Sequence, residues 1–122
     1  MIALWATNAI LALTFLLTGA RLVVLPKTTL EKTGAHWVTD VPTAAVKLLG
    51  VGQLLGAVGL VLPLATGNAP VLVPVAAACL LIVMVGATVV HVRRHENPIL
   101  PIITGAVTLA SFALAVTFLP AA

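Results

Sequence analysis

The chain of 122 residues is strongly hydrophobic: hydrophobic residues make up 61% of it, charged residues only 7%, and its mean hydropathy is +1.24. A soluble domain carries about 25% charged residues, so this composition excludes a water-facing surface and indicates an integral membrane protein. The net charge of +3 comes from basic residues beside apolar segments, which is not the dense stripe that a nucleic-acid partner needs. The single cysteine, Cys79, excludes an intrachain disulfide and a CxxC redox pair.

Four apolar segments follow one another along the chain, over residues 2–25, 43–64, 70–92 and 99–119. A helix needs about 20 residues to cross the hydrocarbon core, and backbone groups in lipid must be satisfied within the segment. The sequence therefore predicts an all-α polytopic membrane protein, a single domain over residues 1–122 in which four transmembrane helices form an antiparallel bundle. Proline at Pro42, Pro70 and Pro98 agrees with the three later helix starts.

The first connection, residues 26–42, is longer than the other two. Thr28 and Glu31 have the spacing of a capping box, and Gly34 is suited to ending a short helix. Trp37 has the amphipathic ring that is typical of the headgroup level. These features favour a short interfacial helix or re-entrant flap between the first two transmembrane helices, with a solvated loop as the alternative.

The charged and histidine residues are confined to the first and third connections and the helix ends beside them. They are Arg21, Lys27, Glu31, Lys32, His36, Asp40, Lys47, His91, Arg93, Arg94, His95 and Glu96. In a four-helix protein these two connections share one side, and basic residues favour the cytoplasm. We therefore expect a multi-pass protein of the cell membrane with connections 26–42 and 93–98 in the cytoplasm and both termini outside.

The second apolar segment is rich in glycine: Gly50, Gly52, Gly56 and Gly59. Small residues let membrane helices approach closely, and Gly52 and Gly56 form a GxxxG motif. Helix packing is the expected role of these glycines, and space for a flat ligand is the alternative.

Five residues are candidates for ligand binding at the charged end of the bundle: Arg21, Trp37, Lys47, Gln53 and His91. An unpaired amide in lipid costs several kcal/mol, so Gln53 has to face protein, either as a contact between helices or as a ligand contact. Arg21 and Lys47 are suited to anchoring helix ends at the interface, or to forming the cationic rim of a pocket for an anionic or quinone-like head.

A metal site is a weaker hypothesis. His91 and His95 have the spacing that places two ligands on one helical face, as do His36 and Asp40. The same residues also fit an ordinary charged helix end, and we assign no metal, cofactor or catalytic residue. The sequence holds no recognisable nucleophile with its base. It also has no acidic residue in the first apolar segment, which a small multidrug-type exchanger would need.

Three stretches resemble the DoxX-like family of small membrane proteins: LTGARL at 17–22, KLLGVGQLLGAVGLVLP at 47–63 and MVGATVVH at 84–91. The resemblance covers essentially the whole chain and implies a compact four-helix bundle. It also implies a link to quinone-linked or membrane-associated oxidoreductase complexes, or to the assembly of other membrane proteins. Gln53 stands where many relatives carry Glu, and Arg21 where Lys is frequent. The lost acid weakens the redox interpretation.

Three functions follow as hypotheses. The first is a binding or accessory subunit of a membrane complex, without catalysis of its own. The second is a small membrane enzyme or carrier with a lipophilic-ligand pocket at the cytoplasmic end of the bundle, and the third is a homo-oligomeric channel or carrier. The expected partners are therefore the lipid bilayer, a membrane protein or second copy of the chain, and a lipophilic small molecule.

Overall fold

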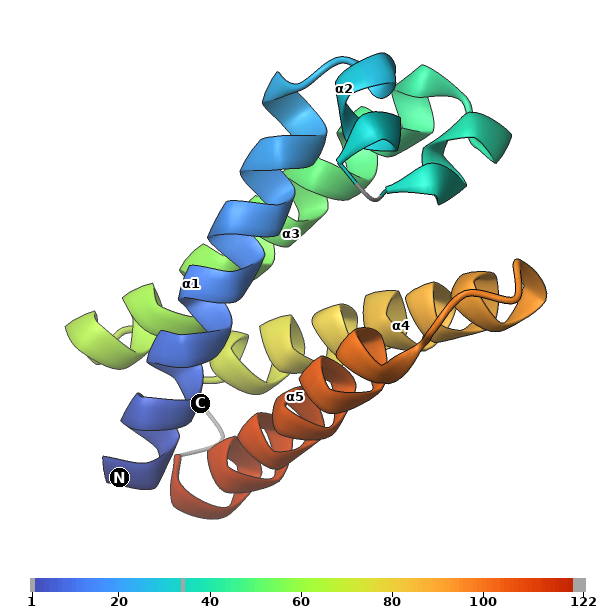
Figure 1. Cartoon of the computed structure of the whole chain (residues 1–122). Helices are drawn as coiled ribbons and strands as arrows, with labels where there is room; N and C mark the ends of the chain where they lie inside the picture. The colour runs from blue at the N-terminus through green and yellow to red at the C-terminus, as the bar shows by residue number, and fades with distance from the viewer. Residues whose placement is uncertain (1, 34, 120–122) are drawn as a thin grey trace.

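The computed structural model describes residues 2–33 and 35–119, and these residues form helices and no strands (Figure 1). The elements are α1 (Ile2–Val24), α2 (Lys27–Lys32), the 3-10 helix η1 (His36–Asp40), α3 (Thr43–Thr66), α4 (Leu72–Arg93) and α5 (Ile99–Phe118). Four of these helices are long and apolar enough to cross a membrane. The predicted all-α fold with four transmembrane helices is confirmed.

The helix boundaries agree with the prediction within a few residues. Helix α4 begins at Leu72 rather than at residue 70, because Pro70 lies in a tight turn whose carbonyl accepts the Val73 N–H at 3.1 Å. Helix α3 continues past Pro63 to Thr66 and ends at Gly67, which has a positive φ of 72°. The Gly67 N–H donates to the carbonyl of Pro63 at 2.9 Å, which closes the last turn of the helix.

The helices form two pairs, α1 with α3 and α4 with α5 (Figure 1). Helices α1 and α3 cross where Gly19 faces Gly50. A Cβ atom added to either glycine would lie 2.8 Å from the carbonyl oxygen of the other. The two backbones therefore touch, which only glycine permits.

The remaining glycines of α3 differ from one another. A Cβ on Gly56 would lie 2.6 Å from a Leu80 methyl carbon, and one on Gly59 would lie 2.8 Å from the Ala76 Cβ, so both face α4 closely. Gly52 has open space at its Cβ position. Within the described chain Gly52 therefore takes no part in close packing between helices. Successive residues turn by about 100°, which places Gly52 nearly opposite Gly50 on the helix.

Three apolar clusters show that the two pairs are joined over only part of their length. At the end that holds the two described chain termini, Leu4, Val73 and Ala115 bring together α1, α4 and α5, and the central cluster also joins the two pairs. The cluster at the opposite end, around Leu22 and Val38, contains residues of α1, α2, η1 and α3 and their connections, and none of α4 or α5. The pairs therefore diverge toward the charged end, as Figure 1 shows.

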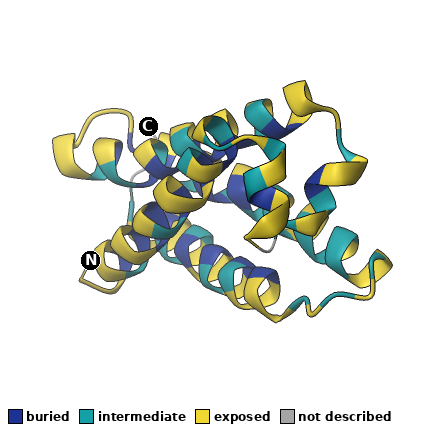
Figure 2. Cartoon of the chain, turned by 45° about the horizontal axis from the view of Figure 1, so that its top comes forward, coloured by how far each residue is buried: buried dark blue, intermediate teal, exposed yellow. Residues whose placement is uncertain are grey.

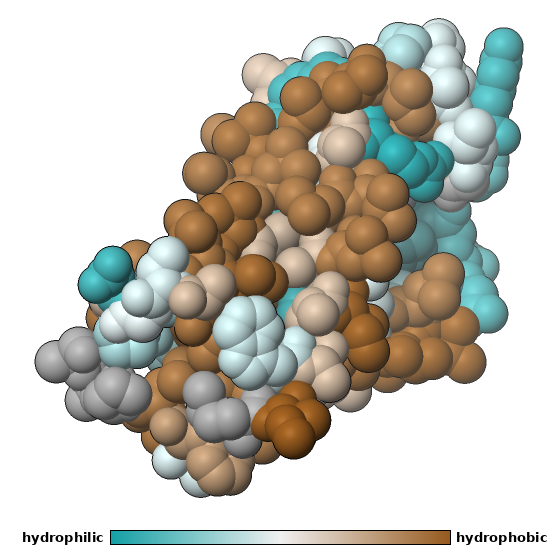
Figure 3. All heavy atoms as spheres, turned by 90° about the vertical axis from the view of Figure 1, so that its left-hand side faces the viewer, coloured by the Kyte–Doolittle hydropathy of each residue, from teal (hydrophilic) through white to brown (hydrophobic). Residues whose placement is uncertain are grey.

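The outer surface is suited to lipid. Exposed residues alternate with buried ones along each long helix (Figure 2), and many of the exposed ones are large and apolar. Hydrophobic side chains cover much of the face in Figure 3, with hydrophilic residues gathered toward its upper right. Water could not solvate such a surface, so the bundle requires a bilayer around it.

The first connection is helical, which agrees with the predicted interfacial helix or flap rather than with a solvated loop. The predicted capping box is wrong, because α2 begins at Lys27 after Pro26 and no side chain caps it, so Thr28 lies inside the first turn. The Pro26 carbonyl accepts the Leu30 N–H at 3.0 Å. Helix α2 ends at Lys32; Gly34 lies outside the described residues.

Candidate functional site

A cavity of about 550 Å³ lies between the two helix pairs, where they diverge. Its walls come from α1, the first connection, α3, α4 and α5, and most of them are apolar. The side chains with polar groups in its lining are Thr14, Thr18, Arg21, Trp37, Gln53, His91 and Thr104. A mostly apolar cavity with a few polar groups is typical of a small-molecule site.

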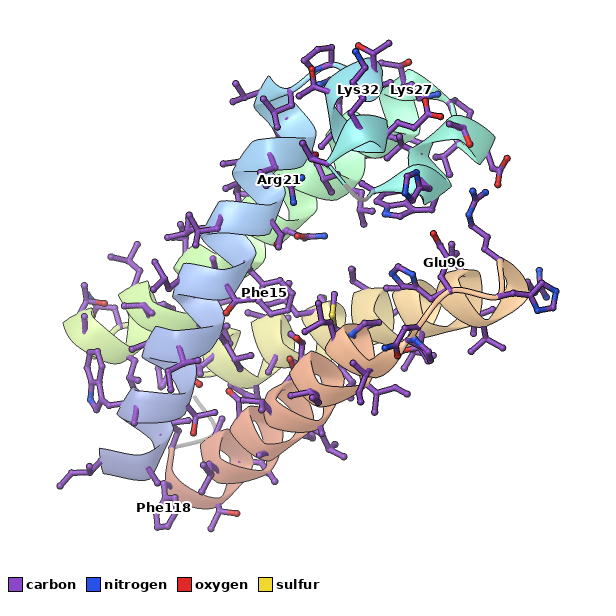
Figure 4. All side chains as sticks on the ribbon, viewed as in Figure 1. Phe15, Arg21, Lys27, Lys32, Glu96 and Phe118 are labelled. Carbon is purple, nitrogen blue, oxygen red and sulfur yellow. The ribbon has the colours of Figure 1, made fainter. Side chains whose placement is uncertain are left out.

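Helix α1 presents one face to this cavity. Thr14, Thr18 and Arg21 follow the helical repeat, and Figure 4 shows Phe15 and Arg21 on the side of α1 toward the other pair. The Arg21 guanidinium donates to the Thr33 hydroxyl at 2.6 Å. Within the described residues Arg21 forms no ion pair, and no carboxylate lines the cavity. The wall near Arg21 therefore carries uncompensated positive charge.

Gln53 is the most deeply buried polar group of the cavity wall, with only 6% of its surface exposed. The Thr18 hydroxyl donates to its Oε1 atom at 2.6 Å. This contact between helices was one of the two expected roles of Gln53. In the described part of the chain the amide N–H groups of Gln53 have no protein partner, so they are free to donate to a bound molecule.

Charged residues link the two helix pairs beside the mouth of the cavity. Arg94, after α4, forms an ion pair with Asp40 of η1, and its Nε lies 3.4 Å from the Glu96 carboxylate. The same Glu96 oxygen lies 3.3 Å from Nδ1 of His91, which lines the cavity. This chain of contacts links η1 to the end of α4 across the gap between the pairs.

Lys47, unlike the other four candidate residues, is not in the cavity wall. Its ammonium donates to the carbonyls of Val23 at 2.9 Å and Leu25 at 2.8 Å. These carbonyls lie at the C-terminal end of α1, where a cation is favourable because the last carbonyls lack partners within the helix. Lys47 therefore holds the end of α1 against the start of α3.

The arrangement needed for the metal hypothesis is not formed. Helix α4 ends at Arg93, and His95 has a positive φ of 57°, so His91 and His95 do not share a helical face. The N–H of Glu96 donates to the His91 carbonyl at 2.8 Å, which completes a Schellman-type helix end. Among the residues that the structure describes, no three His, Cys, Asp or Glu side chains meet.

Two polar contacts were missed from the sequence. Thr18 orients Gln53, and its hydroxyl oxygen also lies 3.0 Å from the Thr14 carbonyl, the acceptor that a helical threonine ordinarily uses. Far from the cavity, Asn8 donates to the Leu60 carbonyl at 2.8 Å and accepts a bond from Ser111. A lone asparagine within an apolar segment was the available signal, because lipid cannot satisfy it.

The fold and the cavity define a four-helix membrane protein with an apolar site between two pairs of helices. A family model described as the DoxX-like family matches residues 6–118, and the chain belongs to that family. No curated protein and no solved structure matches the chain.

Proposed function

We propose that this protein binds a lipophilic small molecule with a polar head in the cavity between its two helix pairs. The observation that carries the proposal is the cavity itself, which combines apolar walls with the buried amide of Gln53 and with the guanidinium of Arg21, which has no ion-pair partner among the described residues. The charged mouth formed by Asp40 and Arg94 is suited to separating such a ligand from water. Binding, transport or enzymatic turnover of the ligand would all begin at this site.

Substitution of Gln53 by Leu is expected to weaken ligand retention about 10- to 100-fold, because it removes the amide but keeps the volume. His91→Ala is expected to weaken retention by a smaller factor, because His91 lies nearer the mouth. The measurement is mass spectrometry of lipid extracts from protein purified in mild detergent, compared with the unsubstituted protein.

The matched control is His95→Ala, which changes the same residue type outside the cavity and should leave retention unchanged. Circular dichroism would verify that every variant keeps its helices. If Gln53→Leu and His91→Ala both retain as much ligand as the unsubstituted protein, the proposed site is wrong.

The accessory-subunit role, and with it a redox or quinone-linked complex, stays a prediction from the family resemblance. The free cation and amide in the cavity are compatible with a quinone head, which accepts hydrogen bonds at its carbonyl oxygens. A companion protein that survives purification in stoichiometric amount would favour the accessory role over an autonomous ligand-binding protein.

The proposed orientation places the mouth of the cavity in the cytoplasm, because the basic residues gather there. A cysteine introduced at Asn68, in a Cys79→Ser background, is expected to react with a membrane-impermeant maleimide in intact cells. A cysteine at Asn97 should react only after permeabilisation. The opposite labelling pattern would reverse the orientation.

A further inference from the structure

A second, apolar crevice of about 360 Å³ lies between α3 and α4. Its lining residues are Ala45, Leu48, Leu49, Gly52, Cys79, Leu80 and Val83. None of these side chains carries a charge, an amide or a hydroxyl group. Leu48 and Cys79 are exposed on the outer surface of the bundle, so the crevice reaches the side of the molecule that would contact lipid.

The crevice adjoins the main cavity. Ala45, Leu49 and Val83 line both, so the two spaces share a wall between α3 and α4. Gly52 leaves the crevice open at this point, because a Cβ at that position would meet no atom within 4 Å. A side chain there would enter the crevice instead of the helix contact.

The polar groups of the main cavity set the chemistry of the ligand's head. Gln53 is more than nine-tenths buried and offers amide N–H groups with no partner among the described residues. Arg21 adds a cation, and none of the described residues that line the main cavity carries a carboxylate to neutralise it. Both groups donate hydrogen bonds, so they select a head that accepts them and carries negative charge.

From these observations we propose that the ligand is a single-chain acidic amphiphile, such as a long-chain carboxylate, and that it enters sideways from the bilayer between α3 and α4. Its head binds Arg21 and Gln53, and its hydrocarbon tail lies in the crevice past Gly52. The inference rests on the proposed function, because it names the ligand class and the route for the same cavity.

Lateral entry avoids exposure of the tail to water. If the ligand had to enter from water, each methylene group of its tail would leave the bilayer first. Each such group would lower the population of ligand molecules outside the bilayer about fourfold. Passage between α3 and α4 keeps the tail in an apolar environment throughout, while the head slides along the interface toward Arg21. The charged mouth between η1 and the end of α4 would then remain closed.

The test uses the full chain in liposomes with Trp5→Phe, so that Trp37, in the cavity wall, is the only fluorophore. The probe is an eighteen-carbon carboxylic acid with a nitroxide on its fifth carbon, supplied in the bilayer. We expect saturable quenching of Trp37 that unlabelled octadecanoate reverses and its methyl ester reverses about tenfold less well. Equal competition by the ester would overturn the acidic head.

The route is tested with Gly52→Phe, which fills the crevice without entering a helix contact. This substitution should lower the affinity or the rate of quenching by the long-chain probe about tenfold. A six-carbon nitroxide carboxylate, added from water, does not need the crevice and should quench Trp37 as it does in the unsubstituted protein. Gly52→Ala and Leu55→Phe, the latter an exposed position of α3 outside both cavities, are the controls and should change neither.

The outcomes separate the two proposals. If the long-chain probe is unaffected by Gly52→Phe while Gln53→Leu abolishes quenching by both probes, the cavity binds ligand but the lateral route is wrong. If neither probe gives saturable quenching in the unsubstituted protein, the acidic amphiphile is wrong. In that case the proposed function can still hold, because another ligand could occupy the cavity. It fails too if Gln53→Leu retains the same molecules, in the same amounts, as the unsubstituted protein in the lipid extracts.

Discussion

Gly50→Leu is expected to lower the free energy of unfolding by at least about 3 kcal/mol. At Gly50 even a Cβ atom would lie 2.8 Å from the Gly19 carbonyl oxygen, and this neighbour is backbone that cannot rotate away. Helices α1 and α3 would have to separate, although theirs is the most extensive contact between any two of the described helices. Thermal or denaturant-induced unfolding in detergent micelles, followed by circular dichroism, measures the loss.

The matched control is Gly52→Leu, the same change two residues farther along α3. Open space surrounds the Cβ position there, and leucine favours helix more than glycine does, so stability should stay within about 1 kcal/mol. Gly19→Leu should reproduce the effect of Gly50→Leu from the other helix. Equal stability of the Gly50 and Gly52 variants would show that the close crossing is not what joins α1 to α3.

Asn8→Leu is expected to cost about 1–3 kcal/mol, because it removes two buried contacts that join three helices. Asn8 of α1 donates to the Leu60 carbonyl of α3 and accepts from Ser111 of α5, and both polar side chains are fully buried. After the substitution the Ser111 hydroxyl loses its partner in α1. The same unfolding measurement reports the change.

Thr108→Val provides the comparison for Asn8. Thr108 is equally buried on α5, but its hydroxyl donates within its own helix, to the Thr104 carbonyl at 2.7 Å. Its loss should therefore cost less than that of Asn8. The double variant Asn8→Leu with Ser111→Ala should recover part of the loss, since neither polar group is then unpaired. Strict additivity of the two single effects would argue against the Asn8–Ser111 bond.

The four transmembrane helices were predictable because hydropathy and length are local properties. Prolines and small polar residues precede α3 and α5, so these two helices begin where expected. The error at α4 arose because Pro70 was expected to start a helix and instead closes a turn before Leu72. Proline is common both in the first turn of a helix and in tight turns, so the presence of Pro70 in the sequence does not distinguish the two.

The cavity was less accessible to prediction. Arg21, Trp37, Gln53 and His91 were expected near one another because they lie at the same end of the bundle, and all four line the cavity. Lys47 lies at the same end of the bundle, but it is six residues before Gln53 on α3 and so points about 120° away from it around the helix, toward the end of α1. The divergence of the two helix pairs depends on how distant segments pack, and no single segment encodes it.

The pairing of Gly19 with Gly50 illustrates the same limit. The glycines of α3 were visible in the sequence, but their partners lie in other helices, and the motif does not say which helix each glycine faces. The sequence alone places Gly50 and Gly52 on nearly opposite faces of the helix, because they are two residues apart. Assigning one face to α1 and the other to an open crevice required the tertiary structure.

The divergence of the two helix pairs also has a consequence for the surrounding bilayer. The described helices lie closer together where α1, α4 and α5 meet around Leu4 than at the opposite end, where the two pairs diverge (Figure 1). Such a tapered inclusion takes up unequal area in the two leaflets. We therefore expect lateral pressure in the leaflet at the wide end to oppose the separation of the two pairs, so the lipid composition of that leaflet would influence the width of the cavity.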